Sequence, residues 1–255
     1  MKTQDLENFF KNLLKPELFD DYCPNGLQIE GQKEIKKILF AVSATRESTE
    51  HAAATRAHAL VVHHGVFWKF HGPKTLTGPF AKRVFPLIRN DINLFGYHLP
   101  LDGHPEIGNA AVLAKTLGLT NLAPFGAYKG ACTGIKGEFP KALAALELKK
   151  LLEEKCNHSV LYSNPIETNG LIKSMGIITG GANSEWRESQ RQGLDSYLTG
   201  EMSEHDYHES REAGIHMFAG GHHATEKFGI LALMGIVQKE FPSLECAFVD
   251  SENPA

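Results

Sequence analysis

Residues 59–65 read Ala-Leu-Val-Val-His-His-Gly, and this stretch indicates both the fold class and a functional site. Its first four residues are apolar without a break, as in a strand buried on both faces of a parallel sheet. The strand ends in His63 and His64. Neighbouring strand residues point to opposite sides, so the pair can reach two metal ions, or supply one ligand and its supporting partner. A single histidine is more often a hydrogen-bonded core residue, but two at a strand end favour function.

Strands and helices alternate on both sides of this segment. Strands are predicted at 35–42, 59–64, 92–97, 158–162, 173–178, 195–198, 215–219 and 244–249. Helices are predicted at 3–14, 47–57, 80–89, 107–117, 142–155, 184–192, 203–213 and 223–239. This alternation predicts an α/β fold with a largely parallel sheet covered by helices. The Gly-rich stretch 121–137 predicts a boundary between a first α/β lobe, residues 1–128, and a second, residues 129–255.

The composition limits the classes of protein to which the chain can belong. Of its 255 residues, 42% are hydrophobic and 22% charged, as in an ordinary globular protein. The net charge of −4 provides no overall attraction to nucleic acid or to an anionic membrane. The four cysteines form no CxxC pair, and no stretch reads as a signal peptide or a membrane span. We therefore expect a cytoplasmic protein that binds no membrane.

A second segment places a histidine at a strand end. Residues 95–104 read FGYHLPLDGH, so His98 ends a predicted strand and Asp102 follows four residues later. The carboxyl ends of parallel strands meet at one edge of a sheet, where these side chains can converge with His63 and His64. The alternative is that Asp102 only caps a turn before Gly103.

The third segment, GGHHATEKFG at 220–229, follows the predicted strand 215–219. Gly220 and Gly221 predict a tight turn that leads directly into a helix. His222 and Glu226 are four residues apart and therefore share one helical face. This pair offers one nitrogen and two oxygens to a metal ion. A capped helix with a local His–Glu hydrogen bond is the simpler alternative.

The ligand set predicted from these segments has three imidazoles and two carboxylates. Five protein ligands exceed the three of an ordinary catalytic zinc site and suit two ions that share a carboxylate and a bridging water. Zinc, iron, manganese and cobalt all accept such a donor set, so the sequence leaves the metal open. The predicted ligands are His63, His64, Asp102, His222 and Glu226.

Six segments of the chain resemble one known family. They are PNGLQIEG (24–31), VVHHGVFWK (61–69), GYHLPLDGHPEIGN (96–109), TGG (179–181), YLTGE (197–201) and GGHHATEKFG (220–229). They are similar to the YbgI-type members of the NGG-interacting-factor-like family, the group called GTP cyclohydrolase 1 type 2 homologs. The resemblance covers essentially the whole chain. The longer members carry an inserted middle domain, for which this chain has no room.

The resemblance implies a fold, a metal site and an assembly. It implies two intertwined α/β lobes with mixed sheets covered by helices, and a dinuclear metal site between the lobes. The five ligands named above match the family's metal-binding positions, and His98 matches a histidine that lines the site. The resemblance also implies a homohexameric ring.

Two functions remain open at this point. The first is a metal-dependent hydrolase acting on a nucleotide or a related small molecule, with GTP ring opening as the named candidate reaction. Glu201 and His98 are then the expected acid and base groups. The alternative is a non-enzymatic protein that traffics metal or forms a ring-shaped scaffold. Nucleic acid is disfavoured as a partner by the net charge.

Overall fold

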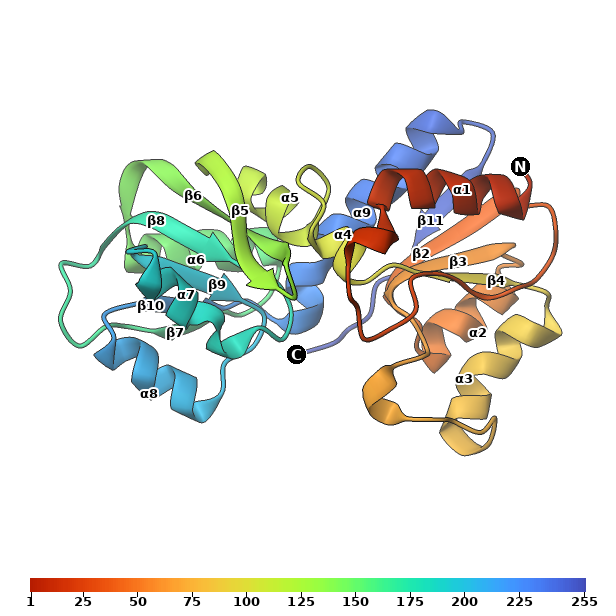
Figure 1. The fold of residues 1–255 in the computed structure, drawn as a ribbon, viewed down its shortest axis with the longest axis horizontal. Helices are drawn as coiled ribbons and strands as arrows, with labels where there is room; N and C mark the ends of the chain where they lie inside the picture. The colour runs from red at the N-terminus through yellow and green to blue at the C-terminus, as the bar shows by residue number, and fades with distance from the viewer. The chain divides into compact units, whose positions relative to one another are not determined.

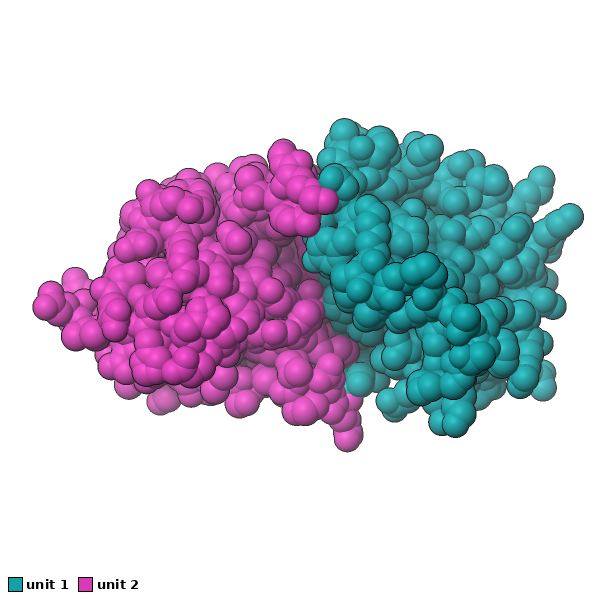
Figure 2. All heavy atoms as spheres, turned by 60° about the horizontal axis from the view of Figure 1, so that its bottom comes forward, with its two compact units in different colours: residues 1–101, 230–251 teal, residues 102–229, 252–255 magenta.

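Two mixed β-sheets organise the chain in the computed structural model, which describes all 255 residues. Each sheet belongs to one of two units, coloured separately in Figure 2. Unit 1 comprises residues 1–101 and 230–251, and unit 2 comprises residues 102–229 and 252–255. The chain therefore leaves unit 1 and returns to it, which interleaves the two units along the sequence.

The sheet of unit 1 has the strand order β1-β4-β3-β2-β11. Its four strands β4, β3, β2 and β11 pair in parallel, and β1 pairs antiparallel with β4 at the edge. The bounds are β1 (Gly26–Ile29), β2 (Lys37–Ser43), β3 (Ala59–His64), β4 (Asn93–Gly96) and β11 (Glu245–Phe248).

Helices cover both faces of this sheet (Figure 1). On one face, Phe10 of α1 (Thr3–Leu14) packs against Phe95 of β4, with ring centroids 5.8 Å apart. On the other, Leu60 and Val62 of β3 lie in a buried cluster with residues of α2 (Arg46–Ala54) and α3 (Gly78–Arg89). The strands are therefore buried on both sides, which explains their unbroken apolar runs.

The sheet of unit 2 has the strand order β5-β6-β8-β9-β10-β7. Its central strands β8, β9 and β10 are parallel, while β5, β6 and β7 pair antiparallel with their neighbours. The bounds are β5 (Thr120–Tyr128), β6 (Ala131–Ala144), β7 (Leu161–Ser163), β8 (Leu171–Ile177), β9 (Ser196–Thr199) and β10 (His216–Ala219).

This second sheet is also packed on both faces. One core cluster joins Leu198 and Phe218 to residues of α5 (Asn109–Thr116) and α6 (Ala145–Cys156). The other joins Tyr197 and Met217 to Trp186 of α7 (Trp186–Arg191), near α8 (Glu204–Glu212). The remaining helices are α4 (Leu99–Asp102), α9 (His222–Glu240) and 3-10 turns at Pro16–Leu18, Lys69–His71 and Asn183–Glu185.

The structure confirms the expected α/β class with mixed sheets covered by helices. The largely parallel sheet predicted from strand and helix alternation describes unit 1, whereas antiparallel strands make up half of the second sheet. Sequence analysis missed the strands β1, β5 and β6. No helix combines the length and apolar character needed to cross a bilayer.

The predicted lobe boundary at residue 128/129 lies inside unit 2, at the turn of the hairpin formed by β5 and β6. The glycines of this region serve close packing between strands as well as turns. A Cβ on Gly134 would lie 2.3 Å from the carbonyl oxygen of Ile177 on β8, so no larger residue fits there. The Gly-rich composition therefore marks strands and not a junction between lobes.

Helix α6 provides a matched test of the core of unit 2. Leu148 is fully buried, whereas Leu146 on the same helix is 65% exposed. We expect Leu148→Ala to lower the free energy of unfolding by about 2–5 kcal/mol and Leu146→Ala to change it by less than about 0.5 kcal/mol. Denaturant unfolding of the two variants measures both values, and equal losses would contradict the packing described here.

Candidate metal centre

In unit 1, the candidate site residues gather at the carboxyl ends of three parallel strands. Strand β2 ends at Ser43, β3 ends at His63 and His64, and His98 follows β4. The register pairs Ser43 with His64 across the two strands. Because parallel strands run in the same direction, their ends reach one edge of the sheet together. The sequence positions of these residues are far apart, but the sheet makes them neighbours.

Three imidazoles of unit 1 form a compact cluster. The ring centroid of His63 lies 4.5 Å from that of His64 and 5.0 Å from that of His98. Ring nitrogens of the three residues lie within 4.8 Å of one another, close enough to share an ion. His63 and His98 are buried, whereas His64 is half-buried. Imidazole suits zinc, iron and other first-row metals.

Hydrogen bonds fix the ring orientations of the two predicted ligands. His63 Nδ1 lies 3.1 Å from the carbonyl oxygen of Tyr97, to which only a protonated nitrogen can donate. His63 therefore carries its lone pair on Nε2. His64 Nδ1 lies 3.0 Å from Ser43 Oγ. Metal-binding histidines are commonly held in this way through the nitrogen that does not bind the metal.

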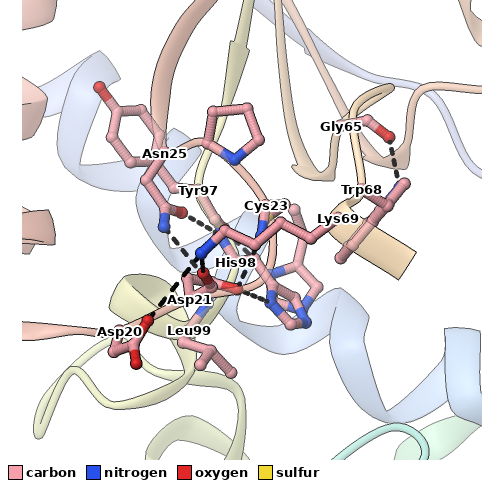
Figure 3. A network of polar contacts seen from close by, with 12 residues as sticks. Asp20, Asp21, Cys23, Asn25, Gly65, Trp68, Lys69, Tyr97, His98 and Leu99 are labelled. Atoms are coloured by element: carbon pink, nitrogen blue, oxygen red, sulfur yellow. Dashed lines mark hydrogen bonds and ion pairs between the residues drawn. The ribbon is translucent and has the colours of Figure 1, made fainter. Parts of the chain in front are cut away.

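His98 is held by a buried carboxylate that sequence analysis missed (Figure 3). Asp21 Oδ1 lies 3.0 Å from His98 Nδ1, and Asp21 Oδ2 accepts from the backbone N–H of Leu99 and from Asn25 Nδ2. The Asn25 side chain in turn accepts from the backbone N–H of His98 at 2.8 Å. Burial by itself raises the pKa of Asp21. The hydrogen bond and charge of His98, together with hydrogen bonds from Asn25 and from the backbone of Leu99, outweigh burial and hold that pKa well below its usual range.

In unit 2, the parallel strands β8, β9 and β10 also deliver their carboxyl ends to one place. Gly180 follows β8, Gly200 follows β9 and Gly221 follows β10. Their backbones are joined, since Gly200 N–H donates to the Gly180 carbonyl and Gly221 N–H donates to the Gly200 carbonyl. Gly180 and Gly221 have positive φ values of 70° and 88°, which favours glycine.

These loops surround His222 and Glu226, which face each other on the first turns of α9. His222 Nε2 lies 3.3 Å from Glu226 Oε2, and His222 Nδ1 lies 2.5 Å from Glu201 Oε1. A Cβ on Gly180 would lie 2.2 Å from Glu226 Oε1, so glycine leaves room for this carboxylate. Burial lowers the pKa of His222, but hydrogen bonds and charges of Glu226 and Glu201 outweigh it and raise that pKa to about 9. The two carboxylates thus favour a positive charge at this position.

The remaining predicted ligand, Asp102, is buried in unit 2 and oriented by an asparagine. Asn109 Nδ2 donates to Asp102 Oδ1 at 2.8 Å. Asn109 Oδ1 accepts from the backbone N–H of Gly229, one turn after Glu226. The side chain of Asn109 therefore connects Asp102 to the helix that carries His222 and Glu226. If Asp102 only capped a turn, it would not need this buried hydrogen bond from Asn109.

The structure thus brings the predicted site residues together in two groups. Unit 1 joins His63, His64 and His98, while unit 2 joins His222 to Glu226 and Glu201. Three supporting residues were missed by sequence analysis: Asp21, Asn25 and Asn109. Asp21 and Asn25 lie in the loop before β1, where polar residues read as turn formers, and Asn109 is the first residue of α5.

Other histidines have structural partners. His58 Nδ1 accepts from the backbone N–H of Lys37, and His216 lies between the hydroxyls of Tyr162 and Thr168. His205 and His208 lie on exposed positions of α8, as the polar sequence of that helix predicts. The chain has 13 histidines, and the candidate centre therefore accounts for only some of them.

Comparisons with known proteins show the family to which this chain belongs. The model of the Duf34/NIF3 family (NGG1p interacting factor 3) matches residues 1–254. The chain belongs to the DUF34/NIF3 family. It is 42% identical to the GTP cyclohydrolase 1 type 2 homolog of Haemophilus influenzae and 38% identical to that of Escherichia coli K12, each over 100% of both chains.

Two solved structures of other proteins have the same fold. The protein named ybgI, described as of unknown function, matches with a TM-score of 0.91 and 37% identity over 100% of both chains. TTHA1606 from Thermus thermophilus matches with a TM-score of 0.89 and 29% identity, again over 100% of both chains.

The Asp21 contacts predict a large and specific loss of stability. Asp21→Asn keeps the shape of the side chain but removes its charge. It also replaces one carboxylate oxygen by an NH2 group, which faces N–H groups that themselves donate hydrogen bonds. We expect it to lower the free energy of unfolding by about 3 kcal/mol, since the buried groups that donate to this carboxylate lose a charged acceptor. The neighbouring Asp20, whose side chain is 62% exposed, supplies the control Asp20→Asn with an expected change below about 0.5 kcal/mol. Denaturant unfolding distinguishes the two, and a loss shared equally by both variants would contradict the assignment.

The same carboxylate predicts a pH dependence with a defined sign. The pKa of Asp21 is lower in the folded chain than in the unfolded chain, so its stabilisation is complete above the unfolded pKa of about 4 and is lost as the pH falls below it. The difference in unfolding free energy between wild type and Asp21→Asn should therefore be constant near pH 7 and shrink toward about pH 3. A difference that grows on acidification would show that the carboxylate is not held ionised by these contacts.

Proposed function

We propose that this protein binds two divalent metal ions through His63, His64, Asp102, His222 and Glu226 and uses them for hydrolysis. The single observation that carries the proposal is the donor set of the two units, with His63 and His64 at the end of β3 in unit 1 and Asp102, His222 and Glu226 in unit 2. Three imidazoles and two carboxylates exceed the three protein ligands of one catalytic zinc and fit a dinuclear centre. Zinc, iron and manganese all suit these donors.

The supporting contacts favour metal binding over the simpler alternatives. His63 and His64 are both held through Nδ1, which leaves Nε2 as the atom that can bind a metal ion. His222 is held through Nδ1 by Glu201, and its Nε2 faces Glu226. A carboxylate, an imidazole and a metal ion in this order are a recurring arrangement in metalloproteins. Glu201 is then a positioning residue for His222, in addition to its expected role as an acid or base.

The chemistry follows from the charges in the two groups. When bound, two divalent ions supply Lewis acidity, which acidifies water and neutralises charge on an oxygen-rich substrate. His98 lies beside His63 with its Nδ1 on Asp21, so its Nε2 can hold or pass a proton during water addition. We propose a nucleotide or a related small molecule as the substrate. The named relatives are called GTP cyclohydrolase homologs, which makes GTP the first compound to assay.

Metal content gives a direct test. We expect close to two metal ions per chain in the purified wild type and a sharp loss in His64→Ala and in Glu226→Ala, because each removes a donor atom. Matched controls are His71→Ala and Glu204→Ala, which change exposed residues of the same types and should keep the wild-type metal content. Elemental analysis combined with native mass measures the ions per chain and the predicted hexamer in one experiment.

Two outcomes would count against the proposal. Metal content that is equally low in wild type and variants would mean that the ligand set is wrong. Turnover by a chain shown to be free of metal would remove the ions from the reaction. Metal that is bound by these residues but leaves readily under mild chelation would favour a metal-trafficking role over a hydrolase.

A further inference from the structure

Residues 252–255, here called the C-terminal strap, fold back onto the helix that carries two of the candidate ligands. The strap belongs to unit 2, whereas the strand β11 before it belongs to unit 1. Figure 1 shows the C-terminus beside the first turns of α9. The oxygen of Ala255 accepts a hydrogen bond from the backbone N–H of His223 at 3.1 Å. The strap therefore contacts the helical turn that lies between His222 and Glu226.

This hydrogen bond supplies a partner that α9 cannot supply from within. The N–H groups in the first turn of an α-helix find no acceptor inside that helix. A side chain just before the helix commonly accepts from one of them and stabilises the turn. The residues before α9 are Gly220 and Gly221, which have no side chain. The oxygen of Ala255 accepts from His223 instead, so loss of the strap favours fraying of the turn that carries His222.

A second contact ties the strap to the end of α6. The ring of His158 lies two residues past this helix, with Nε2 3.1 Å from the carbonyl oxygen of Pro254 and Nδ1 2.6 Å from that of Ser159. A carbonyl oxygen only accepts, so the ring donates to Pro254 when Nε2 carries a proton and to both carbonyls when it is doubly protonated. The Asn253 side chain shapes the strap itself, because its Oδ1 accepts from the N–H of Ala255 at 3.0 Å. His158 and Asn253 therefore hold Ala255 in place against α9.

His158 also packs against the turn that leads into α9. A Cβ on Gly221 would lie 2.9 Å from Cε1 and Nδ1 of the His158 ring, which is too close for a side chain. The φ of Gly221 is 88°, a value that also favours glycine. A Cβ on the preceding Gly220 would lie 3.5 Å from the sulfur of Cys156 at the end of α6. The end of α6, the strap and the two-glycine turn therefore meet directly before His222.

We propose that the C-terminal strap clamps the first turn of α9 and thereby slows the release of a metal ion held by His222 and Glu226. These two residues are four positions apart, so they share a face only while the turn between them is helical. His158 is then a positioning residue for this turn. The inference rests on the proposed function, because it concerns a metal ion of the same site. The clamp on the turn acts without metal and can be tested separately.

The strap is suited to open without unfolding the chain. All four of its residues are exposed, so hydrogen bonds and not buried apolar side chains hold it. The core clusters of unit 2 are built from other residues, and detachment of the strap leaves them intact. The strap can therefore regulate how long the metal ion is retained.

Chelator competition with the zinc-loaded, full-length chain tests the effect on metal release. We expect zinc to leave about tenfold faster from a variant that ends at Ser251 and from His158→Ala, because each removes a contact that orients the ligand-bearing turn. His158→Gln keeps an N–H that can donate to Pro254 and should retain a rate near that of the wild type. His208→Ala is the matched control, since it removes a histidine that is 59% exposed on α8 and pairs with Glu204.

Hydrogen exchange of the metal-free chain gives a readout that does not depend on zinc. The amides of residues 222–226 should exchange faster in the shortened chain and in His158→Ala, whereas those of α8 should keep their wild-type rates. Wild-type exchange at 222–226 in both variants would overturn the proposal. So would faster exchange throughout unit 2, because it would show a general loss of stability. A wild-type chain that holds no zinc would refute the proposed metal centre, whereas zinc that leaves both variants at the wild-type rate would refute the clamp alone.

Discussion

Parallel pairing of strands is the constraint on which the candidate site depends. In unit 1 the pairing of β2, β3 and β4 brings Ser43, the two histidines of β3 and His98 to one edge of the sheet. In unit 2 the pairing of β8, β9 and β10 does the same for three Gly-containing loops and for His222. Adjacent parallel strands end at the same edge of the sheet. Residues at these ends therefore lie close together in space even when they are far apart in sequence. Both faces of each sheet are covered, which leaves the strand ends as the place for polar chemistry.

The second requirement is that the donors be held by other groups, as four of the five are. His63 is held by a backbone carbonyl, His64 by Ser43, Asp102 by Asn109 and His222 by Glu201. Partners of this kind hold an imidazole or a carboxylate in one orientation before any ligand arrives, which reduces the cost of binding. A cluster of histidines with only solvent around it would lack this preorganisation. The contacts therefore support a functional explanation better than residue types alone.

Much of the fold and of the candidate site could be predicted from the sequence, because the patterns that indicate them are local. The apolar run before His63 predicts a buried strand, and the spacing of His222 and Glu226 predicts a shared helical face; the structure has both. The strands β5 and β6 were missed because glycines such as Gly134 read as turns, although a close approach to the next strand is what excludes a side chain there. Asp21 was missed because a carboxylate in a loop gives no sign that residues 77 positions away will surround it. Long-range partners of this kind appear only once the strands are placed.

The most direct test of the central claim is an anomalous diffraction measurement on crystals of the metal-loaded protein, collected at the absorption edge of the bound metal. The account predicts two peaks per chain, about 3.5–4 Å apart, as in other dinuclear sites. The peaks should lie within bonding distance of His63, His64, Asp102, His222 and Glu226. A single peak, or peaks beside other residues, would contradict the dinuclear centre proposed here.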